Sequence, residues 1–390
     1  MLLKKNNWEV KKLGEVCDII SGSTPKTNNP QYWDGDYYWV TPAELDGNKW
    51  ISSTERTITD MGVKSAHLQL LPSGTVLLSS RAPIGKIAIT TCPMYCNQGF
   101  KNLVCKNVIL NEFVYWFLLF STEYLKSLGT GATFKEISKK VVEQVDVPVP
   151  PLPEQSRIVE ELDQLSNIIE KKRQQLSELD NLAQSIFYDM FGDPVTNEKG
   201  WEVKKLGEVC EPKSKIIRAN KQYLSKDKIR YIDISSIDNS CNTITHTNVM
   251  NFGDAPSRAQ QIVLIGDVLV SLVRPNLRNI ALISYDYDDL VASTGFCVLR
   301  TIEIINSYYL LYCVLGENFT DYLMERTSGA NYPAVREEDI KGYDLCIPPL
   351  SLQQLFAQKI EAIEKEKELI KQSIKETEEL FNSRMDYYFG

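Results

Sequence analysis

Residues 154–192 contain no proline or glycine before Gly192, and apolar side chains recur through them at alternating steps of four and three. Only Lys172 interrupts this pattern. The spacing predicts a helix that buries one narrow stripe against a second helix. A helix of about 38 residues is roughly 57 Å long, which is more than a small core can hold. The stretch therefore predicts a rigid rod that separates two parts of the chain.

The chain carries this stretch twice. A shift of 198 positions places residues 149–152 on 347–350 and residues 191–192 on 389–390. A second identity opens each copy, because residues 8–17 and 201–210 both read WEVKKLGEVC. The chain is therefore an internal duplication in which each copy ends in a long helix. The predicted seam consists of Ile158, Leu162, Leu165, Ile169, Leu176, Leu179 and Ile186 in the first helix, and of Phe356, Ile360, Ile363, Ile370, Ile374 and Phe381 in the second.

Between the opening segment and the helix, the two copies share short runs rich in Val, Ile and Leu that are bounded by turn residues. Such runs predict β-strands. Aromatic-rich stretches with helical spacing follow and predict one helix in each copy. Each copy is therefore expected to be a compact α+β domain with its own small core. The matched strand regions are 37–41 with 229–233, 74–80 with 266–272, 87–89 with 280–282 and 99–100 with 295–296, and the predicted helices are 111–128 and 306–326.

Four parts follow from this pattern. We expect one globular domain at residues 1–150, a long helix at 151–192, a second globular domain at 193–348 and a second long helix at 349–390. The WEVKKLGEVC segments are expected to be structural, and we hypothesise that each packs against the long helix of the other copy. The polar segment 21–30 and the basic segment 213–228 share no pattern, so the frame repeats while the loops differ.

Composition narrows the class of protein. Hydrophobic residues make up 43% and charged residues 24% of the 390 residues, which is ordinary for a globular protein. No apolar run reaches the 18 residues that a membrane-spanning helix needs, and the first ten residues lack the apolar core of a signal peptide. We therefore expect a cytoplasmic protein. Nine cysteines and two histidines lack a zinc-site spacing, so the cysteines are expected to be buried, reduced thiols and no metal site is predicted.

The net charge of −8 is unevenly distributed. Residues 154–191 contribute −4 and residues 351–389 contribute −2, so the globular parts are close to neutral. Residues 204–230 contain nine basic and three acidic side chains. A nearly neutral domain with a basic face can bind phosphates, although charge alone equally fits an ordinary solvated surface.

Catalytic motifs are missing from the sequence. The Gly85-Lys86 pair lacks the rest of a phosphate-binding loop, and Gly129–Gly131 does not complete a dinucleotide-binding pattern. No Asn/Asp-Pro-Pro-Tyr motif for amine methylation occurs, and two histidines leave little scope for acid–base catalysis by His. No catalytic residue is therefore predicted.

The remaining candidates are polar and basic residues near glycines and strand ends. Arg, Asn and Gln can bond bidentately to the edges of guanine or adenine, so a doubled set of them favours a reader of nucleic acid over a plain surface. The candidates are Ser23, Lys26, Arg81, Lys86, Asn97, Gln98, Thr130, Thr133 and Lys135 in the first copy, and Arg218, Lys221, Arg274, Asn276, Arg278, Ser293, Thr294, Asn331 and Arg336 in the second.

This layout resembles the specificity subunit of type I restriction–modification enzymes. The resemblance covers the whole chain and rests on the tandem repeat with its two helices. The lead into the second helix departs from the first, since Ser351 and Leu352 replace Pro153 and Glu154. The shared short motifs are the W-x-x-x-x-L-G-[DE]-[IV] openings at Trp8, Leu13, Gly14, Glu15 and Val16 and at Trp201, Leu206, Gly207, Glu208 and Val209, and the helix leads at Pro150, Pro151, Leu152 and Gln155 and at Pro348, Pro349, Leu350 and Gln353.

The resemblance implies a function. Each globular domain would be a target recognition domain that reads one half of a bipartite double-stranded DNA target, and the helices would form an antiparallel coiled coil that sets the gap. The subunit itself would be non-catalytic and hold no cofactor. Two modification subunits would use S-adenosylmethionine to methylate adenine N6, and restriction subunits would add ATP- and Mg²⁺-dependent cleavage.

Two other classes stay open. The chain could be the recognition part of a fused methyltransferase–nuclease, which binding of S-adenosylmethionine to the isolated chain would reveal. It could also be a coiled-coil adaptor that binds only protein, which predicts no preference for any DNA sequence.

Overall fold

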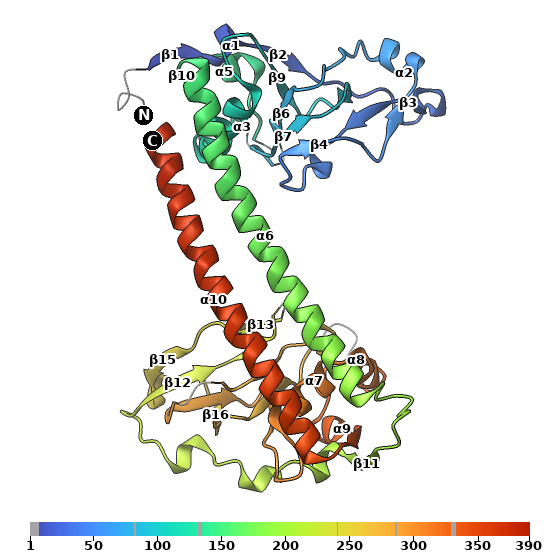
Figure 1. Ribbon diagram of the computed structural model, residues 1–390, viewed down its shortest axis with the longest axis vertical. Coiled ribbons are helices and arrows are strands. Elements are labelled where there is room, and N and C mark those ends of the chain that lie inside the picture. The colour runs from blue at the N-terminus through green and yellow to red at the C-terminus, as the bar shows by residue number, and fades with distance from the viewer. Residues whose placement is uncertain (1–7, 82, 132–134, 240, 285–286, 329–332) are drawn as a thin grey trace. The chain divides into compact units, whose positions relative to one another are not determined.

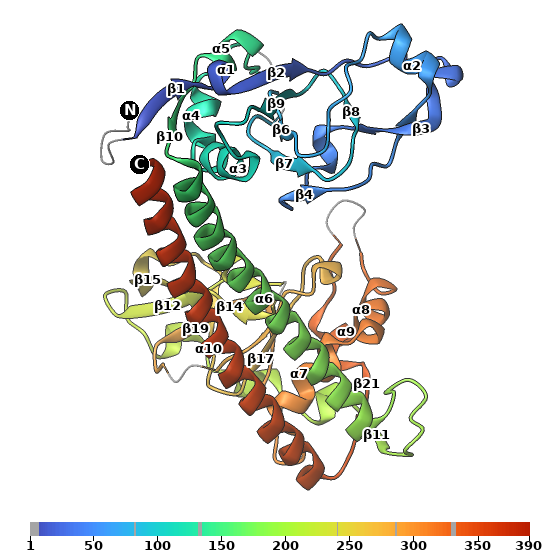
Figure 2. The same cartoon turned by 45° about the horizontal axis from the view of Figure 1, so that its top comes forward.

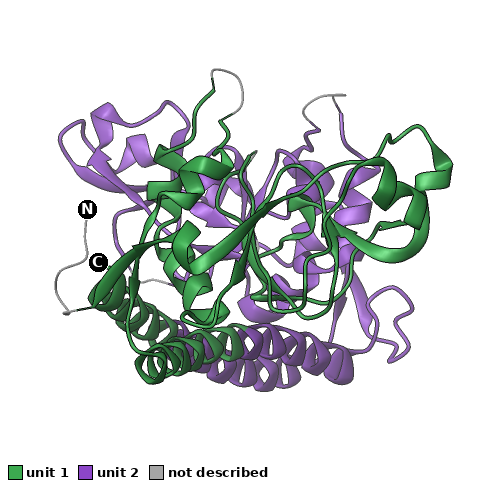
Figure 3. Cartoon of the chain, turned by 90° about the horizontal axis from the view of Figure 1, so that it is seen from above, with its two compact units in different colours: residues 1–173, 372–390 green, residues 174–371 purple. Residues whose placement is uncertain are grey.

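The computed structural model describes residues 8–81, 83–131, 135–239, 241–284, 287–328 and 333–390. The chain divides into two compact units, residues 1–173 with 372–390, and residues 174–371 (Figure 3). The two long helices are α6, Leu152–Phe191, and α10, Leu350–Phe389 (Figure 1). Each unit therefore contains a globular part, the first half of one long helix and the last half of the other. The four consecutive parts expected from the sequence remain a prediction.

The globular part of the first unit combines three sheets with short helices. A five-stranded sheet has the order β2-β9-β6-β7-β4, a three-stranded sheet has the order β5-β3-β8, and β1 pairs with β10. Helix α3 lies along β6 and β7 (Figure 2). The strands are β1 Glu9–Lys12, β2 Cys17–Ser21, β3 Trp33–Val40, β4 Trp50–Ile51, β5 Thr57–Ile58, β6 Val76–Leu78, β7 Ile87–Thr90, β8 Tyr95–Cys96, β9 Lys101–Cys105 and β10 Asp146–Val149; the short helices are α1 Leu13–Val16, α2 Asp60–Ser65, α3 Asn111–Phe120, α4 Thr122–Ser127 and α5 Lys139–Glu143.

The second unit repeats part of this plan. Its sheets have the orders β18-β17-β20, β15-β12-β19-β16, β13-β14 and β11-β21. The strands are β11 Glu202–Lys205, β12 Lys228–Ile232, β13 Ile237–Asp238, β14 Thr243–Ile244, β15 Asn248–Asn251, β16 Ala259–Ile262, β17 Val268–Ser271, β18 Ile280–Leu282, β19 Leu290–Ser293, β20 Phe296–Leu299 and β21 Asp344–Ile347; the short helices are α7 Ser307–Leu315, α8 Glu317–Met324 and α9 Glu337–Lys341.

Two sets of strand pairings are common to both units. The antiparallel pairs of β6 with β7 and β9 correspond to those of β17 with β18 and β20. The opening strands β1 and β11 pair with β10 and β21, the strands that lead into the long helices. Of these strands, β6, β7, β17 and β18 lie in predicted strand regions, whereas the predicted region 99–100 ends just before β9. The predicted α+β fold is confirmed.

Each predicted helix after the strands is broken in two. In the first unit α3 ends before Ser121 and α4 begins at Thr122. In the second unit α7 ends before Gly316, which has an extended backbone. The predictions of single helices over 111–128 and 306–326 were therefore wrong at these points, because the apolar periodicity of the sequence continues across the breaks.

The opening segments lie in the domain cores. Leu13 and Val16 are buried in one cluster with Met385 and Phe389, which are in the last turns of α10. In the second unit Leu206 shares a cluster with Phe187 of α6. Each opening segment therefore belongs to a core that includes the end of the other copy's long helix.

The long helices run antiparallel where they meet within each unit. In the first unit Glu161 pairs with Arg384, whose Nη2 lies 3.0 Å from Glu161 Oε2, and Lys172 pairs with Ser373. In the second unit Lys367 Nζ lies 2.7 Å from Asp180 Oδ1. Every predicted seam residue is buried or half-buried. Several of them also pack into the domain cores, namely Ile158 and Leu162 in the first unit and Phe356, Ile360 and Ile363 in the second.

The nine cysteines are all free. All are buried except Cys92, Cys105 and Cys241, which are half-buried. No helix among the described residues is long and apolar enough to cross a membrane.

Candidate nucleic-acid interface

In the first unit, backbone hydrogen bonds join three segments around Ser80. The Ser80 N–H donates to the Gly99 carbonyl at 2.7 Å, and the Ile137 N–H donates to the Ser80 carbonyl at 2.9 Å. Within the third segment, the Thr130 N–H donates to the Glu136 carbonyl at 3.0 Å. We call this meeting of the loop after β6, the loop before β9 and residues 130, 131 and 135–137 the loop junction.

The second unit contains the same junction. The Leu272 N–H donates to Gly295 at 2.8 Å, and the Val335 N–H donates to Leu272 at 2.9 Å. The Ser328 N–H donates to Ala334 at 3.0 Å. The duplicated frame therefore holds three equivalent loops together in both units, although their side chains differ. Surface loops on a rigid frame are where proteins usually place binding residues.

In the first unit the polar segment after β2 joins this junction. The Ser23 N–H donates to the Cys96 carbonyl at 3.0 Å, and the Thr24 hydroxyl bonds to the Gln98 side chain. Gly22 allows this close approach, because a Cβ at that position would lie 1.9 Å from the Asn97 carbonyl oxygen. Three predicted residues, Ser23, Asn97 and Gln98, are thus brought together.

Lys86 and Arg81 belong to the same neighbourhood. Lys86 Nζ donates to the Pro42 carbonyl at 3.0 Å, and the Pro42 side chain lies beside Gly99. Arg81 pairs with Glu136 through an isolated backbone bridge. Of the predicted residues in this unit, Ser23, Arg81, Lys86 and Asn97 are half-buried, Lys26, Gln98, Thr130 and Lys135 are exposed, and Thr133 lies outside the described residues.

The second unit places its candidates around the equivalent loops. The Thr294 N–H donates to the Arg258 carbonyl at 2.8 Å, and Arg218 forms a backbone bridge with Gln261. Ser293 is buried and its hydroxyl accepts the Gly295 N–H at 3.1 Å, so it shapes the loop from beneath. Of the other predicted residues, Arg218, Lys221, Arg274, Asn276, Thr294 and Arg336 are exposed, Arg278 is half-buried, and Asn331 lies outside the described residues.

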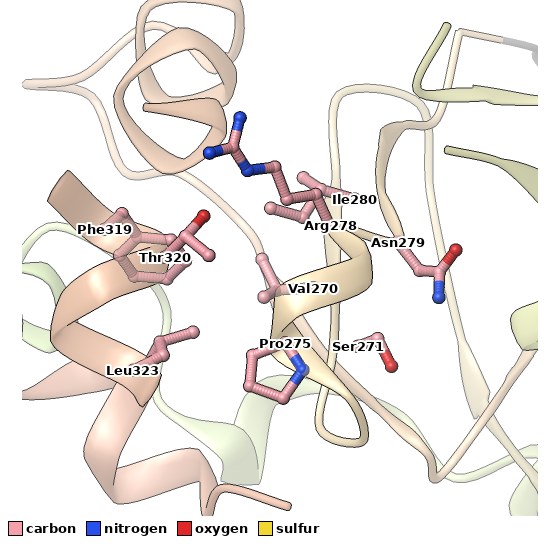
Figure 4. A pocket seen from close by; sticks show the side chains of 9 residues that line it. All are labelled: Val270, Ser271, Pro275, Arg278, Asn279, Ile280, Phe319, Thr320 and Leu323. Atoms are coloured by element: carbon pink, nitrogen blue, oxygen red, sulfur yellow. The ribbon is translucent and has the colours of Figure 1, made fainter. Parts of the chain in front are cut away.

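The turn from Arg274 to Arg278 is the most constrained part of this surface. Both arginines have left-handed backbones, with φ of 49° and 48°, and they flank the 3-10 turn Pro275–Leu277. Such backbones are unfavourable for residues other than glycine and cluster at functional sites. The turn faces Phe319 and Thr320 of α8 across a small pocket (Figure 4). The Arg278 guanidinium lies 3.6 Å from the Glu317 carboxylate.

Two asparagines that the sequence analysis did not select support this turn. Asn239 Nδ2 donates to the Leu277 carbonyl at 2.8 Å, and Asn242 Nδ2 donates to the Arg278 carbonyl at 2.8 Å. They lie between β13 and β14, which pair with each other in antiparallel orientation. Asparagine in a short polar segment predicts a turn. Nothing in the sequence indicates that its amides would bind carbonyls almost 40 positions later.

Acidic side chains moderate the charge of both junctions. A hydrogen bond from the Asn48 backbone, helped by the nearby Lys86 ammonium, holds the pKa of the Asp46 carboxyl below its ordinary value. In the second unit a hydrogen bond to Glu337 raises the pKa of the Lys213 ammonium. In the described part of the chain, no group of three or more His, Cys, Asp or Glu residues could hold a metal ion.

The comparisons with known proteins identify the family of the chain. Residues 5–181 and 198–379 each match the type I restriction modification DNA specificity domain. The specificity subunit of the type I restriction enzyme MjaIX from Methanocaldococcus jannaschii is 29% identical over 370 residues, which cover 90% of this chain and 85% of that protein. The specificity subunit of the Escherichia coli enzyme EcoR124I/EcoR124II is 28% identical over 172 residues, covering 42% of each chain.

Solved structures share the fold. The S subunit of a type I restriction–modification system from M. genitalium superimposes with a TM-score of 0.58 and 14% identity, covering 100% of this chain and 98% of that chain. A chain from another type I R-M system gives a TM-score of 0.57 at 20% identity, covering 99% of both chains. Two matched domains, a duplicated frame and two long helices thus lead to one assignment: this chain belongs to the family of type I restriction–modification DNA specificity proteins.

Proposed function

We propose that this chain is the non-catalytic specificity subunit of a type I restriction–modification complex, and that each unit reads one half of a bipartite DNA target. One observation carries the proposal: the same loop junction recurs in both units with different polar side chains on it. A repeated frame gives both units one binding geometry, while different side chains give each unit its own sequence preference. The two halves of the target are therefore expected to differ.

The predicted domains and DNA-binding residues remain part of this proposal. Target recognition domains at residues 1–150 and 193–348, with spacer helices at 151–192 and 349–390, are supported by the family matches and by the bounds of α6 and α10. The exposed and half-buried candidates next to the loop junctions would contact base edges or phosphates. Two half-sites read from one face of the duplex should lie about one turn, or roughly 34 Å, apart. We infer half-sites of about three to five base pairs with a gap of roughly five to eight.

The partners and cofactors follow from the same proposal. Two modification subunits would dock on the acidic helices and the repeated opening segments, and would methylate adenine N6 with S-adenosylmethionine. Restriction subunits would supply the ATP- and Mg²⁺-dependent cleavage. The complex would act in the cytoplasm. The net negative charge of the helices supports docking of protein rather than DNA along them, because phosphates would be repelled.

The deciding experiment is genome-wide detection of N6-methyladenine by long-read sequencing. A host without other adenine methyltransferases would express the modification subunit encoded beside this chain, with and without the chain. We expect a bipartite motif that appears only when the chain is present. If the complex assembles and no motif appears, DNA reading is wrong and the chain is an adaptor that binds only protein. Binding of S-adenosylmethionine to the isolated chain would instead support a fused methyltransferase.

The role of single residues can be tested in the same system. Alanine at Arg278 should relax the preference at one base position of the second half-site by about 10- to 100-fold, because a base contact carries sequence information. Alanine at Lys26 should instead weaken binding to all sequences and lower the salt dependence by about one counterion. Identical effects of the two variants would contradict this division of roles.

A further inference from the structure

Each long helix has in its first turn a glutamine whose side chain is completely buried. Gln155 in α6 and Gln353 in α10 have no exposed area. Within α6 and α10, which the structure describes from end to end, Lys367 is the only other buried polar residue. Buried amides are costly unless all their polar atoms have partners. The two glutamines therefore need a specific environment, and the structure shows one.

Gln155 makes three hydrogen bonds to the backbone of its own domain. Its Oε1 accepts the Leu110 N–H at 2.8 Å. Its Nε2 donates to the Val108 carbonyl at 3.1 Å and to the Pro150 carbonyl at 2.8 Å. The side chain thus joins the first turn of α6 to the start of α3 and to the end of β10. All of these residues lie within the first unit.

Gln353 makes the same three bonds in the second unit. Its Oε1 accepts the Asn306 N–H at 2.8 Å. Its Nε2 donates to the Ile304 carbonyl at 3.2 Å and to the Pro348 carbonyl at 2.8 Å. We call Gln155 and Gln353, with these partners, the glutamine clamps. Only a side chain with both an acceptor and a donor can bind an N–H and two carbonyls at once, so neither Leu nor Glu can replace them.

The ends of the long helices are held by aromatic packing together with hydrogen bonds from exposed or half-buried side chains. Phe389 lies 5.4 Å from Phe113 in the first unit, between ring centroids, and Phe191 lies 4.7 Å from Tyr309 in the second. Apolar contacts are non-directional, so they tolerate small rotations of the helix. Hydrogen bonds are directional. The clamps are therefore buried, directional contacts in the first turn of each helix that restrict the angle at which it leaves its domain.

That angle matters because the helices are long. A rod of about 60 Å that tilts by about 5° at its root moves its far end by roughly 5 Å. The rise per base pair of DNA is only about 3.4 Å. A less constrained attachment of the helix to its domain would thus change the spacing between half-sites by about one base pair, even if the helix itself stayed rigid.

We propose that Gln155 and Gln353 are positioning residues that set how strictly the protein measures the gap between its two half-sites. They act by restricting the angle at which each helix leaves its domain, and they contact no base. This inference rests on the proposed function, since it concerns the spacer in a bipartite target. Base readout and gap readout would therefore be separate properties, carried by the loop junctions and by the glutamine clamps.

The test compares gap preference rather than overall activity. The full complex with its modification subunits would be given duplexes that carry the same half-sites with gaps one base pair shorter, equal and one or two longer. Initial methylation rates and binding constants would be measured for the wild type, Gln155→Met and Gln353→Met. Methionine keeps the length and helix preference of glutamine but loses all three hydrogen bonds. Gln164→Met and Gln354→Met are matched controls, because both glutamines are exposed on the same helices.

We expect the wild type and both controls to prefer the natural gap strongly. In the clamp variants, this preference over gaps one base pair away should fall at least 10-fold, while the preference for the bases within each half-site stays unchanged. A clamp variant that folds, as judged by circular dichroism and complex assembly, and keeps the wild-type gap profile would overturn the inference. If Met prevents folding, Gln155→Asn, which retains the amide but reaches less far, is subject to the same criterion.

Failure of the proposed function has a different signature. If the wild type itself shows no preference for a bipartite target, both the proposed function and the role of the glutamine clamps are contradicted. If the wild type prefers one gap and the clamp variants prefer it to the same degree, only the role of the glutamine clamps is contradicted.

Discussion

At the scale of single residues, the carboxylate of Glu161 joins α6 to the last turns of α10 within the first unit. The Arg384 Nη2 and the Tyr388 hydroxyl donate to Glu161 Oε2 at 3.0 and 2.5 Å. Partial burial acts to raise the pKa of this carboxyl, but the hydrogen bonds from Arg384 and Tyr388 outweigh it, and the pKa lies below its ordinary value. The charged form is therefore stabilised in the folded protein.

This shift predicts an acid-sensitive contribution to stability. A depressed pKa in the folded state stabilises the protein above the ordinary value of about 4.5, and the stabilisation is lost as the pH falls through the folded pKa. We expect Glu161→Gln to lower the free energy of unfolding at about pH 7 and to lower it much less at about pH 3. Urea unfolding at both pH values would measure this. The exposed neighbour Glu160 gives the control Glu160→Gln, and an equal effect at both pH values would contradict the prediction.

The glutamine clamps also belong to the residue scale. The sequence repeat predicted a glutamine near the start of both helices. It identified this residue only as part of a shared motif and did not predict that its amide is buried. Burial and the positions of three backbone partners made its role visible. Those partners come from segments that lie up to 49 positions away.

At the scale of the element, the long helices follow their sequence pattern closely. The seam residues are buried or half-buried. Helix α6 spans Leu152–Phe191, so it covers the stretch 154–191 that lacks proline and glycine and also includes Pro153 in its first turn. The one interruption, Lys172, has partners across the seam: its Nζ donates to the Thr377 hydroxyl at 3.2 Å and also to Ser373. A polar residue in a seam commonly fixes helix register and lowers stability.

We therefore expect Lys172→Leu to raise the free energy of unfolding by about 1 kcal/mol, because it removes a partly buried charge and completes the apolar stripe. Thermal or urea unfolding would measure this change, with the exposed neighbour Lys171→Leu as control. A loss of stability specific to Lys172→Leu would mean that the bonds to Ser373 and Thr377 contribute more than the buried charge costs.

The short elements were less predictable than the long ones. The strands common to both copies were found, since runs such as 74–80 and 266–272 contain β6 and β17. The breaks at Ser121 and Gly316 were not found, and neither was the β13–β14 hairpin. Short strands carry too few residues for a period to emerge. Their formation depends on partners supplied from elsewhere in the chain.

At the scale of the whole molecule, the spacer helices should act as a ruler. Inserting one helical turn after Leu176 would lengthen α6 by about 5.4 Å. We expect the gap in the methylated motif to grow by about one base pair, with both half-sites unchanged. Long-read detection of N6-methyladenine would measure the gap directly. A matched insertion in α10 after Lys371 would test whether both helices must lengthen together.

An unchanged gap in both insertion variants, in a complex that still methylates, would contradict the ruler. This outcome is distinct from failure of the glutamine clamps, which concerns the strictness of the gap rather than its length. The two experiments therefore separate the length of the spacer from the rigidity of its attachment.

The sequence by itself determined the duplication, the long helices with their seam, and the α+β class of each copy. These features follow from sequence repeats and from the period of apolar residues along the chain, so they can be predicted without knowing which distant residues are in contact. The tertiary structure decided which segments meet. It brought three separate loops to one junction in each unit, set Asn239 and Asn242 under the Arg274–Arg278 turn, and gave each domain the beginning of one long helix and the end of the other. Such contacts join residues far apart in sequence, and they depend on how the strands are ordered and on where buried polar groups find partners, which no local pattern records.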